Sequence, residues 1–224
     1  MIRIFIGYDE NETVAYHVLA HSIITNATQP VTISPLRKES FRSFYVRERS
    51  DIESTDFSFT RFLVPYLCYY EGWAMFMDCD MVNTADIAEL WAMRNDAFSV
   101  MCVKHDYQPT DEVKFLGNVQ TRYEKKNWSS VMLFNNARCR ALTPDVVAKE
   151  SGLYLHQFKW LEGDHLIGGL PVTWNYLVGE MTMPTTPRLI HYTLGGPYFD
   201  SYRECEYANL WFAEHALMNH AAKD

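Results

Sequence analysis

The chain has 224 residues, of which 48% are hydrophobic, 15% aromatic and 21% charged, and its formal net charge is −8. This length allows one domain with a sizeable core, and the composition is that of a folded globular protein and not of a disordered one. The acidic balance argues against a general binder of nucleic acid or of anionic membranes, because such proteins need a basic surface.

Five cysteines are scattered along the chain and form no C-x-x-C pair. This set favours free thiols in a reducing compartment over a disulfide framework or a zinc site. The N-terminal stretch MIRIFIGYDENE turns acidic after a few apolar residues, which is a poor signal peptide. The longest apolar stretch, residues 62–77, is broken by Pro65 and by Glu71 and Gly72, so no membrane span is expected. These features predict a cytoplasmic protein.

The first part of the chain alternates between strand and helix patterns. Residues 2–7 (IRIFIG) predict a buried strand, and residues 12–24 carry apolar side chains at helical spacing. Residues 31–36 predict a second strand. Residues 56–70 predict an amphipathic helix, in which Pro65 marks a kink.

The alternation continues with residues 73–78 (WAMFMD), whose apolar run predicts a strand. The next helix would follow an N-cap at Asn83 or Thr84. Further strands are expected at 97–103 and 130–136, joined by a long polar connection of the kind that is usually functional or mobile.

Thr143, Pro144 and Gly152 mark the start and end of a predicted helix at 143–152. Alternating strands and helices indicate an α/β domain with a mostly parallel sheet. Ligands bind such sheets beyond the carboxyl ends of the strands.

Two aspartates separated by one cysteine follow the apolar run at 73–77. Residues two apart in a strand point to the same side, so Asp78 and Asp80 would face each other. Close carboxylates disfavour joint ionisation, and burial raises the cost further. A divalent cation such as Mg²⁺ or Mn²⁺ would neutralise both and leave positions open for water and substrate phosphates. The alternative is a solvated turn in which an aspartate caps the next helix.

Several segments, in order along the chain, resemble the GT-A glycosyltransferases and particularly their family 8 group. FSFTRFLVPYL places an arginine on a helix before the apolar strand WAMFMDCDMVN, which ends in D-x-D, and ADIAELW follows. WSSVMLFNN resembles the second central strand near the acceptor site. LIHYTLGGPYF resembles the C-terminal segment in which a histidine and a glycine turn complete the metal and diphosphate site.

The resemblance implies one GT-A domain over residues 1–224, with a Rossmann-like mixed, mostly parallel sheet flanked by helices. Its nucleotide-binding half would span residues 1–83. The acceptor-side half and the metal-completing segment would span residues 84–199, and a C-terminal helix would lie within 200–224.

The same resemblance assigns a metal to Asp78, Asp80 and His191, with Asp78 also near the ribose. A histidine ligand suits Mn²⁺ better than Mg²⁺. Gly195 and Gly196 would let backbone N–H groups approach the diphosphate. The alternatives are a buried core histidine and an ordinary turn.

For the substrates, the resemblance places Tyr8 against the nucleotide base, Asp9 on a base N–H, and Arg61 on a pyrophosphate or a sugar hydroxyl. Otherwise these are residues of a helix N-terminus and a surface cation. Trp128 and Trp160 are candidates for stacking on acceptor sugars, although large aromatic side chains are more often part of a core.

The chain departs from the family pattern in two places. The C-terminal segment has one extra residue and lacks the lysine of the family's Lys-Pro-Trp. The family's Asp-Gln-Asp corresponds best to residues 162–164, which lack the glutamine. Asp164 is the candidate catalytic carboxylate, with Glu162 as the runner-up.

The resemblance implies Mn²⁺-dependent transfer of a sugar from a nucleotide-diphosphate sugar, with UDP as the nucleotide, to a glycan or other hydroxyl acceptor, with retention at the anomeric carbon. A sugar nucleotidyltransferase is a second possibility, but it usually has a Gly-rich loop with Arg or Lys where this chain has GYDENE. A degenerate nucleotide-sugar-binding module is a third, because of the missing lysine and glutamine. A phosphatase of the haloacid dehalogenase kind would carry D-x-D after its first strand.

Overall fold

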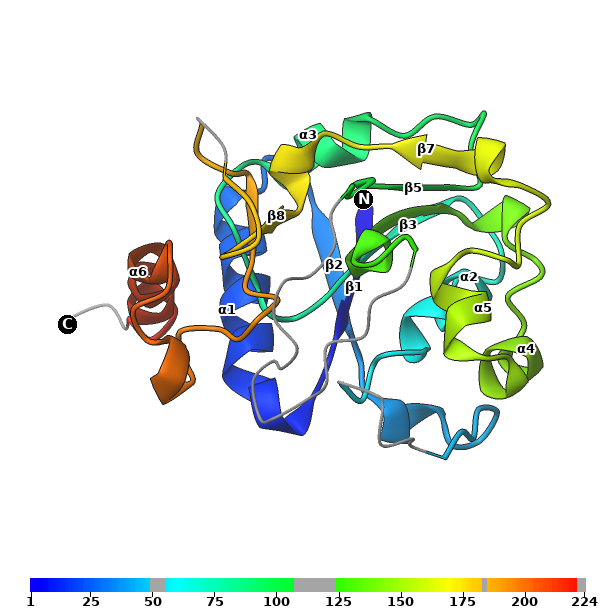
Figure 1. Cartoon of the computed structure of the whole chain (residues 1–224), viewed down its shortest axis with the longest axis horizontal. Coiled ribbons are helices and arrows are strands. Elements are labelled where there is room, and N and C mark those ends of the chain that lie inside the picture. The colour runs from blue at the N-terminus through cyan, green and yellow to red at the C-terminus, as the bar shows by residue number, and fades with distance from the viewer. Residues whose placement is uncertain (49–54, 107–123, 183–184, 221–224) are drawn as a thin grey trace.

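The computed structural model describes residues 1–48, 55–106, 124–182 and 185–220. Its strands form a six-stranded sheet and a smaller three-stranded sheet, flanked by helices (Figure 1). The described strands are β1 (Ile2–Gly7), β2 (Val31–Leu36), β3 (Trp73–Met77), β4 (Met81–Asn83), β5 (Val100–Cys102), β6 (Val131–Asn135), β7 (Ile167–Gly169), β8 (Tyr176–Leu177) and β9 (Leu189–His191). The described α-helices are α1 (Thr13–Asn26), α2 (Val64–Leu67), α3 (Ile87–Ala92), α4 (Pro144–Lys149), α5 (Gly152–His156) and α6 (Ala208–Met218).

The large sheet has the strand order β2-β1-β3-β6-β5-β7. β1 runs parallel to β2 and β3, and β5 runs parallel to β7, whereas β6 is antiparallel to both of its neighbours. The predicted mixed, mostly parallel sheet is therefore confirmed. β1 and β3 both end at the same edge, where Tyr8 and Asp78 follow them.

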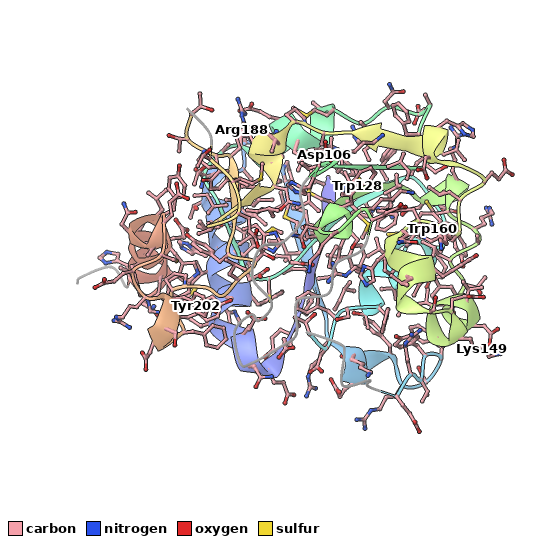
Figure 2. The ribbon with its side chains drawn as sticks, viewed as in Figure 1. Asp106, Trp128, Lys149, Trp160, Arg188 and Tyr202 are labelled. Atoms are coloured by element: carbon pink, nitrogen blue, oxygen red, sulfur yellow. The ribbon has the colours of Figure 1, made fainter. Side chains whose placement is uncertain are left out.

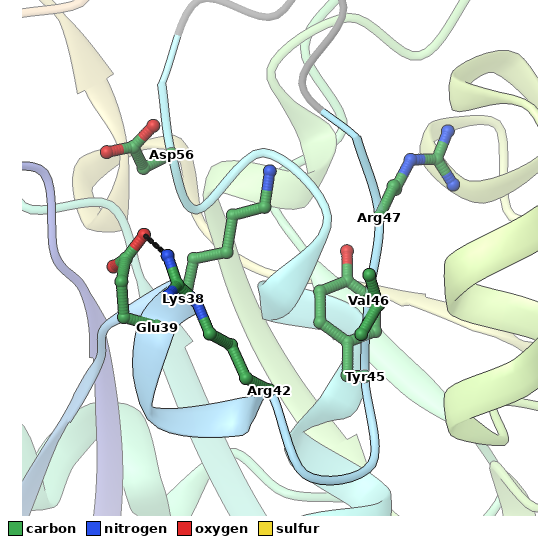
Figure 3. Close-up of a pocket in the computed structure, with 7 residues that line it drawn as sticks. All are labelled: Lys38, Glu39, Arg42, Tyr45, Val46, Arg47 and Asp56. Carbon is green, nitrogen blue, oxygen red and sulfur yellow. Dashed lines mark ion pairs between the residues drawn. The ribbon is translucent and has the colours of Figure 1, made fainter.

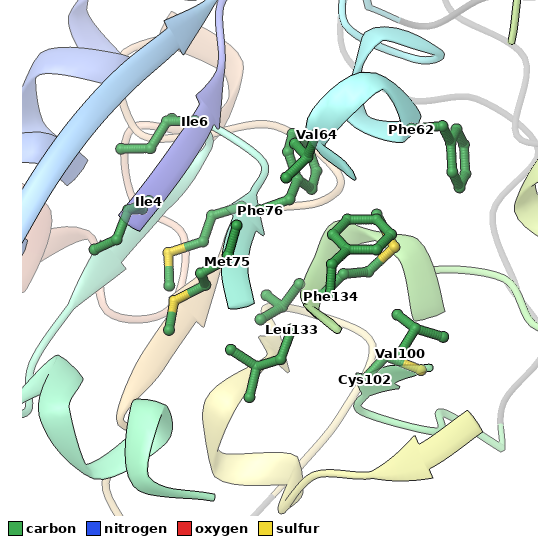
Figure 4. Close-up of a cluster of buried hydrophobic side chains, with 14 of the residues drawn as sticks. Ile4, Ile6, Phe62, Val64, Met75, Phe76, Val100, Cys102, Leu133 and Phe134 are labelled. Atoms are coloured by element: carbon green, nitrogen blue, oxygen red, sulfur yellow. The ribbon is translucent and has the colours of Figure 1, made fainter. Parts of the chain in front are cut away.

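The central strands carry the hydrophobic core. β3 is buried at four of its five positions and β6 at all five, which fits continuous apolar runs covered on both faces. Each large apolar side chain buried here contributes about 1.5–3 kcal/mol to the free energy of unfolding. The core side chains labelled in Figure 4 are Ile4, Ile6, Phe62, Val64, Met75, Phe76, Val100, Cys102, Leu133 and Phe134.

The small sheet has the order β4-β9-β8 and packs with α1 and α6 around a second, smaller core. Val18, Val82, Ile190 and Trp211 belong to this core. In Figure 1, α1 and α6 lie at the left, and α2, α4 and α5 lie at the right. Among the described residues, none of the helices is both long enough and apolar enough to cross a bilayer.

The helix predicted at 56–70 is wrong in its extent. Residues 60–63 form a 3₁₀ turn, and the α-helix α2 covers only Val64–Leu67. Pro65 lies in the first turn of α2 and does not kink it. Backbone N–H groups in the first turn have no partner within the helix, so a proline there removes no helical hydrogen bond. Tyr69 and Tyr70 have positive φ angles and end the helix.

The other helix boundaries differ in detail. Asp86, and not Asn83 or Thr84, caps α3 by accepting a hydrogen bond from the Ala88 N–H at 2.9 Å. Thr143 caps α4 as predicted, but α4 ends at Lys149. Ser151 and Gly152 begin a separate helix, α5, so Gly152 starts a helix instead of ending one. The five cysteines are free thiols, as expected.

Candidate metal centre

Asp78, Asp80 and His191 come together at the carboxyl edge of the large sheet. One potential ligand atom from each lies within 4.8 Å of the other two. The cause is the pairing of β4 with β9, which sets Met81 opposite His191. The Tyr192 N–H also donates to the Asp80 carbonyl at 2.9 Å. The small sheet thus carries a residue from far along the chain to the D-x-D pair.

Asn175 orients the His191 ring. The Asn175 Nδ2 group donates to the Ser130 Oγ at 2.8 Å and to the Asn127 carbonyl at 3.3 Å, so its Oδ1 is left as an acceptor. This oxygen lies 2.9 Å from His191 Nδ1. Nδ1 therefore carries a proton that it donates, and Nε2 points toward the aspartates. A neighbour of this kind commonly fixes the tautomer of a metal-binding histidine.

The distances fit a small divalent cation. His191 Nε2 lies 3.2 Å from Asp80 Oδ1 and 4.0 Å from Asp78 Oδ2. In an octahedral site with bonds of about 2.1 Å, adjacent ligand atoms are about 3 Å apart and opposite ones about 4.2 Å. Two acceptors at 3.2 Å also need a proton or a cation between them. The donor set of two carboxylates and one imidazole suits Mn²⁺.

Arg61 holds the other oxygen of Asp78. Its Nη1 lies 2.9 Å from Asp78 Oδ1 and donates to the Ser129 carbonyl, also at 2.9 Å. The Arg61 side chain is 7% exposed, so it is not a surface cation. Its guanidinium lies over the rings of Phe57 and Phe76. Asp78 therefore has one oxygen fixed by an arginine and the other turned toward His191.

Glu12 is a further carboxyl group beside this centre. It is 1% exposed and accepts a hydrogen bond from the Tyr198 hydroxyl at 2.5 Å. Burial raises the pKa of Glu12 well above its usual value, and the negative charges of Asp80, Asp9 and Asp78 act in the same direction. The hydrogen bond from Tyr198 opposes this rise. Glu12 thus adds an acid with a raised pKa to an already acidic site.

Glu12→Gln should alter how stability depends on pH. A raised pKa means that unfolding releases a proton at pH values between the unfolded value near 4.5 and the folded value. Stability of the metal-free wild type therefore falls as the pH rises through this window, by about 1.4 kcal/mol for each unit of pKa rise. The glutamine variant should lack this loss. The free energy of unfolding of the variant minus that of the wild type should therefore increase from pH 5 to pH 8.

Urea unfolding at both pH values measures this difference. Glu10→Gln, at an exposed neighbouring carboxylate, serves as the control. An equal effect of Glu12→Gln at both pH values would contradict the prediction.

Tyr8 and Asp9 lie directly after β1. Both carboxylate oxygens of Asp9 already accept backbone N–H groups, Oδ1 from Asn11 at 2.8 Å and Oδ2 from Asp56 at 2.9 Å. Asp9 is the N-cap of the turn before α1, as its structural alternative predicts. The half-buried Tyr8 ring meets Tyr16 edge to face, with centroids 5.5 Å apart.

Gly195 and Gly196 form a turn directly after β9, with the Gly195 N–H donating to the Tyr192 carbonyl. Gly195 has a φ of +148°, which favours glycine. A Cβ atom on Gly196 would lie 2.1 Å from the Tyr198 ring. Packing of tyrosine rings against this turn is thus one reason for glycine at these positions.

The two predicted acceptor-side tryptophans lie in different parts of the structure (Figure 2). Trp128 is half-buried, its Nε1 donates to the His105 carbonyl at 2.9 Å, and it immediately precedes Ser129. Trp160 is 6% exposed and packs against Phe134 and Phe158 in the core. Trp160 is thus a core side chain, and Trp128 is the one of the two that could contact an acceptor.

Glu162 and Asp164 do not join the Asp-Asp-His cluster. Glu162 is exposed. The Asp164 side chain is 72% exposed and forms an ion pair with Lys125 at 2.5 Å. A catalytic role for either residue stays a prediction.

A pocket of about 320 Å³, lined mostly by charged residues, lies near the end of β2 (Figure 3). Arg47, on its wall, donates to the carbonyls of Val147, Ala148 and Glu150 and is thus used in packing α4. The pocket is lined by Lys38, Glu39, Arg42, Tyr45, Val46, Arg47 and Asp56.

Sequence reasoning missed Glu12 and Asn175. In the sequence, Glu12 is an ordinary acidic residue at a helix N-terminus. Its contact with Tyr198 depends on how the C-terminal segment folds back, which the sequence pattern does not show. Asn175 has no sequence signal, because its role depends on the contacts with Ser130 and His191.

Comparisons with known proteins agree with this architecture. No family model matches the chain. Protein CDI of Arabidopsis thaliana is 47% identical over 221 residues, an alignment that covers 95% of this chain and 85% of that protein. This identity and coverage place the two proteins in one family.

Solved glycosyltransferase structures share the fold. LgtC superimposes with a TM-score of 0.64 at 12% identity, over 99% of this chain and 98% of LgtC. GlyE of Streptococcus pneumoniae TIGR4 gives 0.63 at 12% identity, over 97% of this chain and 63% of GlyE. The bifunctional WbbM gives 0.58 at 15% identity, over 96% of this chain but only 49% of WbbM. The chain therefore belongs to the family of Protein CDI and has the GT-A glycosyltransferase fold.

Proposed function

We propose that this protein is a metal-dependent glycosyltransferase that uses a nucleotide-diphosphate sugar, with UDP as the nucleotide. The observation that carries the proposal is the meeting of Asp78, Asp80 and His191 within 4.8 Å at the carboxyl edge of a GT-A sheet. A neighbour with this fold, LgtC, is described as a galactosyltransferase that has been solved with donor and acceptor sugar analogues.

Different residues of the site would bind the metal, the diphosphate and the nucleotide base. Asp78, Asp80 and His191 would hold Mn²⁺ or Mg²⁺, which supplies Lewis-acid stabilisation to the departing diphosphate. Arg61 fixes the orientation of Asp78 and adds positive charge where the diphosphate would lie. The glycine turn at Gly195 and Gly196 would let the backbone approach the phosphate oxygens closely, with the Gly195 N–H itself donating to the Tyr192 carbonyl. Tyr8 would face the base.

The acceptor would enter beside the half-buried ring of Trp128. This residue lies shortly before β6, the strand that pairs with β3. We propose transfer with retention at the anomeric carbon, in which a departing phosphate oxygen takes the acceptor proton. This route needs no separate protein base. It is therefore compatible with the exposed, ion-paired state of Asp164.

A thermal-shift panel tests the binding part of the proposal. UDP with Mn²⁺ should raise the melting temperature more than UDP alone, GDP with Mn²⁺ or ADP with Mn²⁺. Ligand at 100 times its dissociation constant adds about 2.7 kcal/mol, which corresponds to about 5–10 °C for a domain of this size. No metal-dependent shift with any nucleotide would overturn the proposal.

Turnover separates the enzyme from a binding module. Release of UDP from a panel of UDP-sugars, with and without acceptors, should depend on Mn²⁺. Binding without turnover would favour a degenerate module. Proton NMR of the first product gives the stereochemistry, and a β-linked product from an α-donor would rule out retention.

A further inference from the structure

One turn contacts both ends of the metal centre. Residues 127–130 lie just before β6, and the Ser130 carbonyl accepts the Asp78 N–H at 2.9 Å. Asn175 bonds the Ser130 hydroxyl on one side and His191 Nδ1 on the other. On the opposite flank, the Ser129 carbonyl accepts from Arg61, which also holds Asp78.

This turn is held in a demanding conformation. Asn127 has a φ of +61°, in the left-handed region that only glycine and, to a lesser extent, asparagine or aspartate adopt readily. The Ser130 hydroxyl donates back to the Asn127 carbonyl at 2.7 Å. The position of the Ser129 carbonyl therefore depends on contacts that keep the turn in place.

His156, at the end of α5, supplies such a contact. Its Nδ1 lies 2.8 Å from the Ser129 hydroxyl. The ring meets Phe62 edge to face and lies near Phe59, with centroids 5.2 and 5.9 Å away. The Ser58 backbone also acts on this ring, in the direction that raises the pKa of His156. In the neutral tautomer with its proton on Nε2, Nδ1 accepts from the Ser129 hydroxyl.

The surroundings keep this histidine neutral. Burial lowers the pKa of His156 to about 3, and the positive charges of Arg61 and Arg47 contribute to the lowering. A neutral ring can accept the Ser129 hydroxyl proton without placing a second cation beside Arg61. A protonated lysine at this position could not accept that hydrogen bond, and it would place a second cation beside Arg61.

We infer that His156 is a positioning residue for the metal centre: through Ser129 it holds Arg61 against Asp78 and so fixes the aspartate for metal and diphosphate binding. The expected effect on metal and diphosphate binding rests on the proposed function. The expected effect on the position of Arg61 does not depend on that function.

The first experiment measures the dissociation constant of UDP by calorimetry at saturating Mn²⁺. His156→Leu and Ser129→Ala should each raise it about fivefold, which corresponds to about 1 kcal/mol, the usual size of one hydrogen bond. His156→Asn, whose side-chain oxygen can replace Nδ1 as acceptor, should stay within about twofold of the wild type. Ser22→Ala, which deletes another buried serine hydroxyl away from the site, should also stay within about twofold.

A double-mutant cycle distinguishes positioning from general destabilisation. If His156 acts through Arg61, His156→Leu should add nothing to the loss already caused by Arg61→Gln. Full additivity of the two losses, or unchanged UDP binding in both His156→Leu and Ser129→Ala, would overturn the inference.

A crystal structure of metal-free His156→Leu provides a test that needs no ligand. The Arg61 guanidinium should leave its position 2.9 Å from Asp78 Oδ1. An unchanged Arg61 would overturn the inference even if the wild type bound no nucleotide. Failure of the wild type to bind UDP, with Arg61 displaced in the variant, would count against the proposed function alone.

Discussion

Asp80→Ala should lower Mn²⁺-dependent turnover of the donor by at least about 10³-fold, because it removes one of three ligands from the centre on which the leaving diphosphate relies. Asp80 Oδ1 is the carboxylate oxygen nearest to His191 Nε2, at 3.2 Å. Its loss should therefore also abolish metal-dependent binding of UDP. Initial rates of UDP release at several Mn²⁺ concentrations measure the first effect, and calorimetry measures the second.

The fold should survive this substitution. Asp80 lies among Asp78, Asp9 and Glu12, and its charge raises the pKa of Glu12. Removal of one charge relieves repulsion in the metal-free protein, so the melting temperature should stay level or rise. Asp86→Ala is the matched control: it removes the N-cap of α3, which should cost about 1 kcal/mol of stability but leave metal dependence intact. Wild-type metal dependence in Asp80→Ala would exclude Asp80 as a ligand.

The parts of the fold that the sequence predicts well are those with a strong local pattern. β1, β2, β3 and β6 follow apolar or β-branched runs, and the N-cap of α4 follows from Thr143 and Pro144. Such signals need no knowledge of distant residues. The D-x-D pair is also visible locally, because it interrupts an apolar run.

Other parts depend on contacts between distant segments. The helix expected at 56–70 fails because Phe57, Phe59 and Phe62 are all buried, so tertiary packing and not an amphipathic helix determines the path of the chain. β4, β8 and β9 are two or three residues long and carry little pattern of their own.

The metal centre combines both cases. Residue patterns alone suggest Asp78 and Asp80, whereas only the resemblance to GT-A enzymes points to His191. Asn175 and His156 position their partners through single hydrogen bonds, and such bonds leave no trace in composition or periodicity. Trp160 is the reverse case. The sequence suggests it as a sugar-stacking residue, but its side chain is part of the core.

The choice between ligand and core residue for His191 can be decided by His191→Ala. A ligand's loss should raise the dissociation constant of Mn²⁺ about 100-fold or more, because even the loss of a residue that merely orients a ligand typically costs 10–100-fold. The structure favours this outcome, since Asn175 turns Nε2 toward the two aspartates. Calorimetric titration of Mn²⁺ without nucleotide gives the value directly.

His191 is 2% exposed, so the alanine variant will also lose packing and some stability. Titration with Mg²⁺ separates this loss from the loss of a ligand. Imidazole favours Mn²⁺ over Mg²⁺, which prefers oxygen. Loss of a true ligand should therefore weaken Mn²⁺ binding more than Mg²⁺ binding and narrow the preference between them. A core histidine would instead give a lower melting temperature with the Mn²⁺ affinity of the folded protein unchanged, and that result would limit the centre to its two aspartates.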